Sequence, residues 1–230
     1  MGVFLLVHGA GLNGRFWKHQ VEALGTRHTV HAITLPGHGG GGGAGQKSVA
    51  AYAGFVHDFA RARNLPPLTL VGHSMGGLIA QEYAHRWPAD VAKLVLVGTG
   101  ARIQIPPFVF EGFKKDLEGS LKGVRPLVFA RTTPREVVEW AETEIRKTPV
   151  EVFLGDLEAC NGFDGAPRLA ALRQPALVVS GSSDNLTPVA LGRALASGIP
   201  GAKLEVVQNA GHFMMIEQPE AVTRLLEATA

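Results

Sequence analysis

The chain has 230 residues, of which 46% are hydrophobic and 18% are charged, and its formal net charge is +2. This composition excludes a disordered chain, and the weak, evenly spread charge excludes the basic surface that is typical of nucleic-acid-binding proteins. The single cysteine, Cys160, excludes an internal disulfide and fits a reducing compartment, so we expect a cytoplasmic protein.

The first apolar run, Val3–Val7, resembles a signal peptide only in its position. It is shorter than the roughly 7–15 apolar residues of such a segment, and no basic residue precedes it. No apolar run approaches the length of about 18 residues that a membrane-spanning helix needs. We therefore interpret Val3–Val7 as a buried strand and expect neither a membrane nor a nucleic-acid partner. The sequence indicates no particular oligomeric state.

Short apolar runs then alternate with longer amphipathic stretches. Six runs predict strands: Val3–Val7, Thr29–Leu35, Leu68–Val71, Leu94–Val97, Ala176–Ser180 and Leu204–Val207. Five stretches predict helices around them: Gly14–Leu24, Ser48–Arg63, Met75–Arg86, Val189–Ala196 and Pro219–Ala228. Because the strands are nearly all apolar, both faces of the sheet must be covered. The expected fold class is α/β, with a mostly parallel sheet flanked by helices.

The stretch between Gly98 and Pro175 breaks this alternation, because no strand is predicted there. Helical patterns lie instead at Val109–Leu121, Pro134–Arg146 and Val150–Ala159. We interpret this insertion as a helical cap over the carboxyl edge of the sheet. The predicted division is a core of residues 1–100 and 168–230 with a cap of residues 101–167. Most of the cap's aromatic side chains are expected to form its own small core: Phe108, Phe110, Phe113, Phe129, Trp140 and Phe153.

The Gly-rich segment Gly37–Gly45 follows the second predicted strand. It is either a flexible surface loop or a mobile wall beside a substrate site. It is not a dinucleotide-binding fingerprint, because the next helix begins too late and no acidic residue lies about 20 positions further on at a strand end.

The segment Gly72-His73-Ser74-Met75-Gly76 matches the G-x-S-x-G pattern. A predicted strand leads into it and a predicted helix leads out of it, which is the context in which a nucleophilic serine occupies a tight, strained turn above the sheet. Glycine is needed at 72 and 76 because the neighbouring backbones approach too closely for a Cβ atom. The alternative is a Gly-rich turn with a bystander serine, and the residues that follow disfavour it.

A serine nucleophile needs a base, and the base needs an orienting acid. On this scaffold the partners follow in the order serine, acid, histidine, each in a loop after a strand. Asp184 follows the fifth predicted strand and His212 follows the sixth, so we predict Asp184 as the acid and His212 as the base. The alternatives are an N-cap role for Asp184 and a buried structural role for His212.

Other titratable residues rank lower. Asp156 and Asp164 lie in the predicted cap, where we expect them on solvated helix faces. His73 flanks the serine and is expected to pack behind it, and His8 is expected to brace a loop. No histidine, cysteine or carboxylate spacing indicates a metal site.

The tetrahedral intermediate of acyl transfer also needs backbone N–H donors. One is expected to be the amide of Met75, at the start of the helix after the serine. The other is expected from the loop after the first strand, where we choose the amide of Ala10.

These residues give the chain a resemblance to the α/β-hydrolase superfamily over nearly its whole length. The similar stretches are LLVHGAGLNGRFW, AITLPGHGG, LVGHSMGGLIAQEYAHRWP, ALVVSGSSDNLTP and AGHFMMIEQPE. They look most like those of small capped members, which include carboxylesterases, enol-lactonases, carbon–carbon bond hydrolases and methyl esterases. The family usually has an antiparallel strand pair before the first parallel strand. Since this chain begins at that strand, we expect a sheet without the pair.

The resemblance implies a serine hydrolase that cleaves a small carboxylic ester, lactone or thioester through an acyl-enzyme. It implies a small-molecule substrate and no cofactor. Two alternatives stay open on the same fold. One is a carbon–carbon bond hydrolase or hydroxynitrile-lyase-like enzyme that uses the same three residues, and the other is a non-catalytic receptor for a small ligand.

Overall fold

The computed structural model describes all residues, 1–230. Six strands form one sheet in the order β2-β1-β3-β4-β5-β6, and every neighbouring pair is parallel. The strands are β1 (Val3–Val7), β2 (Thr29–Ile33), β3 (Leu68–His73), β4 (Val91–Val97), β5 (Ala176–Gly181) and β6 (Lys203–Val207). The expected mostly parallel α/β sheet is confirmed, and each strand lies within a few residues of its predicted position.

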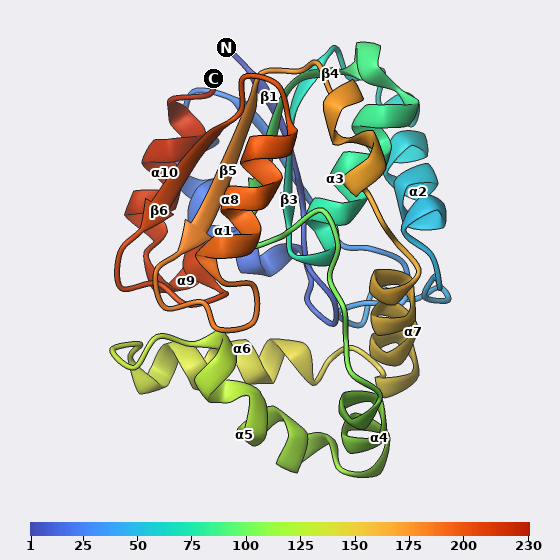
Figure 1. The fold of residues 1–230 in the computed structure, drawn as a ribbon, viewed down its shortest axis with the longest axis vertical. Helices are drawn as coiled ribbons and strands as arrows, with labels where there is room; N and C mark the ends of the chain where they lie inside the picture. The colour runs from blue at the N-terminus through green and yellow to red at the C-terminus, as the bar shows by residue number, and fades with distance from the viewer.

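Helices cover both faces of this sheet (Figure 1). One face carries α2 (Val49–Ala62), α3 (Met75–Arg86) and α8 (Val189–Gly198). The other carries α1 (Lys18–Leu24), α9 (Met214–Glu217) and α10 (Pro219–Glu227). A short 3₁₀ turn, Gly14–Trp17, precedes α1.

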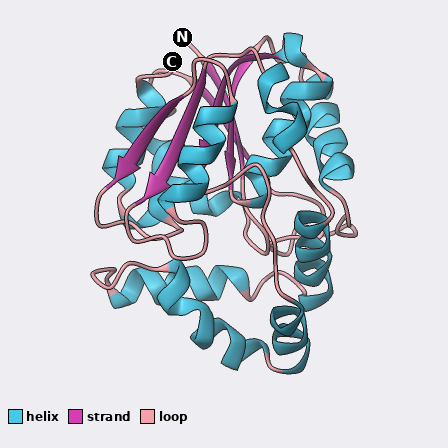
Figure 2. Cartoon of the chain, in the orientation of Figure 1, coloured by secondary structure: helices cyan, strands magenta, loops and turns pink.

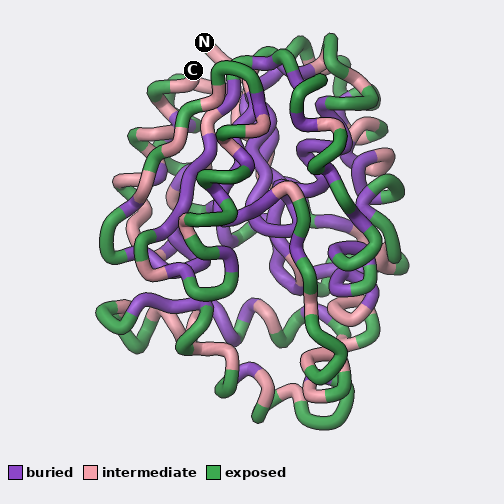
Figure 3. Tube along the Cα trace, viewed as in Figure 1, coloured by how far each residue is buried: buried purple, intermediate pink, exposed green.

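The sequence of β1 explains these two layers. Leu5 and Val7 belong to the core under α2 and α3, whereas Phe4 and Leu6 belong to the core under α1 and α10. Side chains alternate between the faces of a strand, so a run that is apolar at every position fills two cores at once. Figure 3 shows the result, because the four inner strands β1, β3, β4 and β5 are buried along most of their length. No helix is long and apolar enough to cross a membrane.

Four helices lie between β4 and β5 in the chain and gather at the carboxyl ends of the strands (Figures 1 and 2). They are α4 (Pro107–Lys115), α5 (Leu117–Val128), α6 (Arg135–Ile145) and α7 (Val150–Asn161), and a 3₁₀ turn, Ala166–Ala171, returns the chain to β5. We call these four helices the cap. The domain division at residues 101–167 stays a prediction. Both chain termini lie at the opposite end of the molecule.

One predicted cap helix is wrong. The expected single helix Val109–Leu121 is two helices that meet at Asp116, whose backbone is extended (φ −151°, ψ 92°). The Asp116 carboxylate accepts a hydrogen bond from Gly119 N at 2.9 Å and so caps α5. An aspartate N-cap satisfies an amide that the helix leaves without a partner, and this local bond favours a new helix start over continuation.

Candidate active site

Ser74 lies at the turn between β3 and α3. Its backbone has φ 53° and ψ −120°, a conformation that residues with a Cβ atom rarely adopt. Two bonds hold the turn, because Ser74 N donates to Val97 O at 2.9 Å and Thr99 Oγ1 donates to Ser74 O at 2.9 Å. The predicted strained turn is therefore present, with the serine at its tip.

The two glycines of the pattern have the packing role that the sequence suggested. A Cβ atom on Gly72 would collide with the backbone of Gly76, and a Cβ atom on Gly76 would lie 2.5 Å from the carbonyl oxygens of Val7 and His8. The turn therefore fits closely against the end of β1, which brings Ser74 beside the loop that follows β1.

Asp184 and His212 form a buried pair at the ends of β5 and β6. Asp184 Oδ2 and His212 Nδ1 are 2.9 Å apart, and only 4% and 2% of the two residues are exposed. Asp184 does not cap α8, which begins after Pro188. The structure thus brings together the acid and the base that the sequence predicted.

Thr187 is a member of this group that the sequence analysis missed. Its hydroxyl donates to Asp184 Oδ2 at 2.6 Å, and its amide donates to Asp184 Oδ1 at 2.8 Å. Burial of Asp184 favours its neutral form, but the charge and hydrogen bond of His212 and the hydrogen bonds of Thr187 outweigh burial and lower the pKa of Asp184. Asp184 therefore stays ionised and holds a proton on Nδ1 of His212, which leaves Nε2 free to act as a base.

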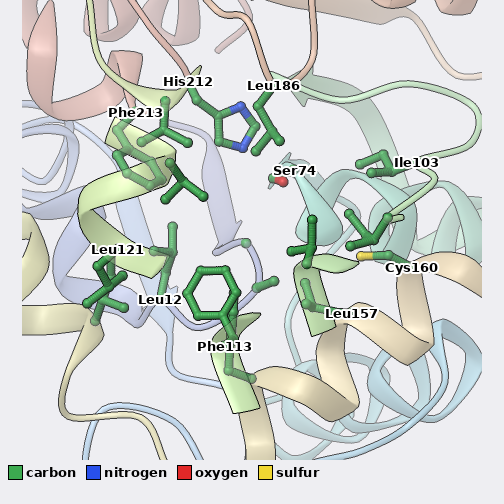
Figure 4. Close-up of a pocket in the computed structure, with 18 of the residues that line it drawn as sticks. Leu12, Ser74, Ile103, Phe113, Leu121, Leu157, Cys160, Leu186, His212 and Phe213 are labelled. Atoms are coloured by element: carbon green, nitrogen blue, oxygen red, sulfur yellow. The ribbon is translucent and has the colours of Figure 1, made fainter. Parts of the chain in front are cut away.

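Ser74 and His212 face the same pocket (Figure 4). No hydrogen bond joins Ser74 Oγ to the imidazole in this structure, although the acid–base pair is fully formed. Such contacts are commonly loose before substrate binds. The pocket therefore contains both the predicted nucleophile, Ser74, and the predicted base, His212.

Two backbone amides close to Ser74 have no hydrogen-bond partner: that of Ala10, which lines the pocket, and that of Met75, which follows Ser74 in the chain. Ala10 N donates neither to a backbone carbonyl nor to a side chain. Met75 is the first residue of α3, where an amide has no partner within its helix. The start of a helix also favours negative charge. Both donors that the sequence predicted are therefore available to an oxyanion.

The pocket between the sheet and the cap has a volume of about 120 Å³ and is mainly apolar. Glu142 is the one charged carboxylate in its lining, and it is paired with Arg125 and with Arg146. The apolar lining comes mostly from the cap and the loops that lead into it: Leu12, Ile103, Ile105, Val109, Phe113, Leu121, Val124, Val128, Phe129, Ile145, Phe153, Leu157, Leu186 and Phe213.

Comparisons with known proteins agree with this geometry. The model of the alpha/beta hydrolase family matches residues 4–225. The chain belongs to this family. It is 30% identical to a pimeloyl-[acyl-carrier protein] methyl ester esterase of Serratia marcescens, over 97% of this chain and 92% of that protein.

Solved structures of hydrolases are also similar. A thermophilic esterase from Thermogutta terrifontis is 28% identical with a TM-score of 0.90, over 99% of this chain and 89% of that one. An enzyme described as degrading N-acyl homoserine lactones is 25% identical with a TM-score of 0.86, over 100% of this chain and 93% of that one. The match therefore spans the sheet and the cap together.

His8 and His73 make structural contacts. His8 Nδ1 donates to Gly9 O at 2.8 Å, and His8 Nε2 accepts from Leu35 N at 3.0 Å. Burial and the neighbouring His38 lower the pKa of His8 to about 3, against the hydrogen bond to Gly9. His73 is wholly buried beside Ser74, and its Nε2 lies 2.9 Å from His212 O. Both fit the bracing and packing roles expected of them.

The structure tests three expectations about the cap and its surroundings, and it contradicts those for Asp156 and for the cap aromatics. Asp156 is not on a solvated helix face but is wholly buried, whereas Asp164 is exposed as expected. Most cap aromatics do not form a separate core, because the rings of three of them line the pocket: Phe113, Phe129 and Phe153. The Gly-rich loop is not a wall of the pocket, since none of its residues lines it. Apolar side chains of all four cap helices line the pocket with Ser74, and the rings of Phe113 and Phe153 also pack against each other, with their centroids 4.6 Å apart.

The end of α5 is joined directly to the loops of the acid and the base. His212 N donates to Val128 O at 2.7 Å, and Asn185 N donates to Leu127 O at 3.0 Å. The last carbonyls of a helix have no partner within it, so these amides satisfy both sides. The position of the cap is therefore coupled to the position of the Asp184–His212 pair.

Proposed function

We propose that this protein is a serine hydrolase that cleaves small, uncharged carboxylic esters through an acyl-enzyme. The observation that carries this proposal is that the pocket with Ser74 at its strained turn also contains His212, whose other ring nitrogen is bonded to the ionised Asp184. A histidine in this arrangement can take a proton only on the side of the serine.

The reaction follows from these positions. Ser74 Oγ attacks the carbonyl carbon while His212 Nε2 takes the hydroxyl proton, and Asp184 stabilises the imidazolium that forms. The amides of Ala10 and Met75 donate to the oxyanion. The tetrahedral intermediate collapses as His212 returns the proton to the leaving alcohol. Water then repeats the same steps on the acyl-enzyme and releases the acid.

The pocket supports the choice of substrate. A cavity of about 120 Å³ holds about ten water-sized groups. That is enough for a short acyl chain or a small ring but not for a long lipid tail. Because Glu142 is neutralised by Arg125 and Arg146, the lining offers no free charge to a charged acyl group. The activity named for the relative from Serratia marcescens, hydrolysis of a methyl ester, supports the same reaction class.

Lactones are a second candidate, because the structurally similar lactone-degrading enzyme shares the sheet and the cap. A lactone is a cyclic ester and would follow the same steps with the leaving alcohol still attached to the acyl group. A panel of short p-nitrophenyl esters and of small lactones separates the two, since kcat/KM ranks them directly. The single buried cysteine, Cys160, also supports our proposal that the enzyme works in the cytoplasm.

Covalent labelling tests the proposal. An organophosphate such as diethyl p-nitrophenyl phosphate should add one diethylphosphoryl group, and peptide mapping should find it on Ser74. Rapid quenching with a p-nitrophenyl ester should trap an acyl group on the same peptide. A hydroxynitrile-lyase-like enzyme would form no acyl-enzyme, and a ligand receptor would turn over no ester. Labelling of another serine with full loss of activity would refute the assignment of Ser74.

A further inference from the structure

A second buried carboxylate, Asp156, lies in the cap helix α7 and faces the sheet. It is wholly buried, and three donors surround it. Asp156 Oδ2 accepts from Gly11 N at 2.8 Å and contacts His38 Nε2 at 2.7 Å, and Asp156 Oδ1 accepts from Tyr52 Oη at 2.6 Å. None of these contacts takes part in the reaction described above.

These donors come from separate parts of the core. Gly11 belongs to the loop after β1, which also carries Ala10. His38 belongs to the loop after β2, and its Nδ1 lies 3.0 Å from Pro36 O. Both ring nitrogens of His38 therefore lie against oxygen atoms of the fold, and neither faces the pocket. Tyr52 belongs to α2. Burial, and then Asp156, raise the pKa of Tyr52, which keeps its hydroxyl a donor.

The contact with Gly11 is the one that bears on catalysis. Ala10 and Gly11 are consecutive, and either amide could turn toward the pocket. Asp156 occupies the Gly11 amide, and Phe153, one turn earlier on α7, lies where a Cβ atom of Gly11 would be. Gly11 has φ 68°, which a glycine adopts without strain. Because the Gly11 amide donates to Asp156, the Ala10 amide is the one of the two that can donate to the oxyanion.

We propose that Asp156 is a positioning residue, which acts through Gly11 to fix the oxyanion-binding loop and to join it to the cap. This rests on the proposed function, since it assigns Ala10 to the oxyanion.

The variant Asp156→Leu, which removes both side-chain oxygens and with them the acceptor for Gly11 N, tests this proposal with p-nitrophenyl butyrate as substrate. Complete loss of one oxyanion donor costs about 10²–10³ in kcat, so a misplaced donor should cost about 10- to 100-fold with KM nearly unchanged. The inhibition constant of a short alkyl boronic acid, which mimics the tetrahedral oxyanion, should rise by a similar factor. Rates are expressed per site titrated with the organophosphate, so partial unfolding does not count as lost catalysis.

Two controls separate positioning from simple support of the fold. Tyr52→Phe removes the donor to Oδ1 but leaves the bond from Gly11 to Oδ2, so kcat per titrated site should stay within about threefold. Asp164→Asn changes an exposed carboxylate that accepts only from Ala166 N, and it should change neither constant. Equal losses in Asp156→Leu and Tyr52→Phe, or an unchanged boronic acid constant in Asp156→Leu, would overturn the proposal.

A measurement on the unsubstituted protein keeps the test decisive if Asp156→Leu does not fold. Amide hydrogen exchange should show Gly11 protected in the free enzyme. Ala10 should exchange rapidly until the boronic acid binds and should then become protected. Rapid exchange at Gly11, or no change at Ala10, would contradict the assignment. The organophosphate label on Ser74 is independent of both results, so a failure here is distinguishable from failure of the proposed function.

Discussion

The chain contains two buried histidine–carboxylate pairs that are alike in geometry and different in what surrounds them. His212 and Asp184 are 2.9 Å apart, and His38 and Asp156 are 2.7 Å apart, with all four residues buried. In the second pair both ring nitrogens are occupied, one by Asp156 and one by Pro36 O. In the first pair the second nitrogen faces the pocket with Ser74.

The comparison teaches that a carboxylate alone does not make a histidine a base. What distinguishes His212 is a nitrogen left free on the side of an attacking group, together with unpartnered amides nearby. In both pairs the carboxylate orients the imidazole ring. We propose a catalytic role for the His212–Asp184 pair. The His38–Asp156 pair instead connects the cap to the core.

The largest expected effect comes from removing the hydroxyl of Ser74, which shares a pocket with His212 and not with His38. Ser74→Ala should lower kcat by about 10⁴–10⁶ if the serine, base and acid act as a unit. Steady-state hydrolysis of p-nitrophenyl butyrate, with circular dichroism to check the fold, measures it. Activity within tenfold of the starting enzyme would mean that another group is the nucleophile.

Exchanging the carboxylates for amides separates the two pairs. Asp184→Asn should lower kcat by about 10⁴, because the amide donates to His212 Nδ1 and moves the proton to the nitrogen that must be free. Asp156→Asn should lower kcat far less, and Asp164→Asn should leave kcat unchanged. Kinetics of the three variants under one set of conditions decides this. If either cap variant loses more activity than Asp184→Asn, the acid is wrongly assigned.

The pH dependence of kcat/KM should reflect only the pair with the free nitrogen. Below the ionisation of the base, activity should fall about tenfold per pH unit, because a protonated imidazole cannot accept a proton. Since the pKa of Asp184 is lowered, this carboxylate stays charged as the pH falls through that range and adds no second ionisation there. A pH profile from 4 to 9 checks this, and a flat profile down to pH 4 would count against a histidine base.

The smallest expected effect concerns the length of the acyl chain that the pocket beside Ser74 and His212 can enclose. Short p-nitrophenyl esters, about C2 to C6, should be cleaved with kcat/KM roughly tenfold higher than esters of C12 or longer. Each methylene contributes up to about 0.8 kcal/mol, but only while the pocket can enclose it. A series of chain lengths measured below the micelle concentration provides the test. Rates that climb through C12 and C16 with activation at a lipid interface would indicate an open groove.

Local sequence signals were sufficient for the sheet and for the proposed nucleophile, acid and base. The six apolar runs, and the serine between two glycines at a strand–helix boundary, are patterns formed by residues that are close together in the chain. The burial of Asp156 was not predicted because its partners Gly11 and His38 lie far from it in sequence. The break at Asp116 was visible in principle, since an aspartate followed two residues later by Glu118 is typical of a helix start.

The orientation of the cap depends on tertiary contacts, and that is why the sequence could not predict the lining of the pocket. The aromatic side chains of Phe113 and Phe153 are compatible with either a cap core or a pocket wall. Which one they form depends on where α4 and α7 settle against the sheet, and on contacts such as those of Val128 and Asp156.

The insertion of residues 98–175 between the neighbouring strands β4 and β5 has a consequence for how readily such a protein changes over time. The entropy lost on closing a loop grows only with the logarithm of its length. Compared with the much shorter connection between β3 and β4, this insertion costs only about 1 kcal/mol more in chain entropy. Cap length is therefore nearly free to vary, and a new substrate range can arise by replacing the insertion, provided that its two attachments, at the end of α5 and at Asp156, are kept.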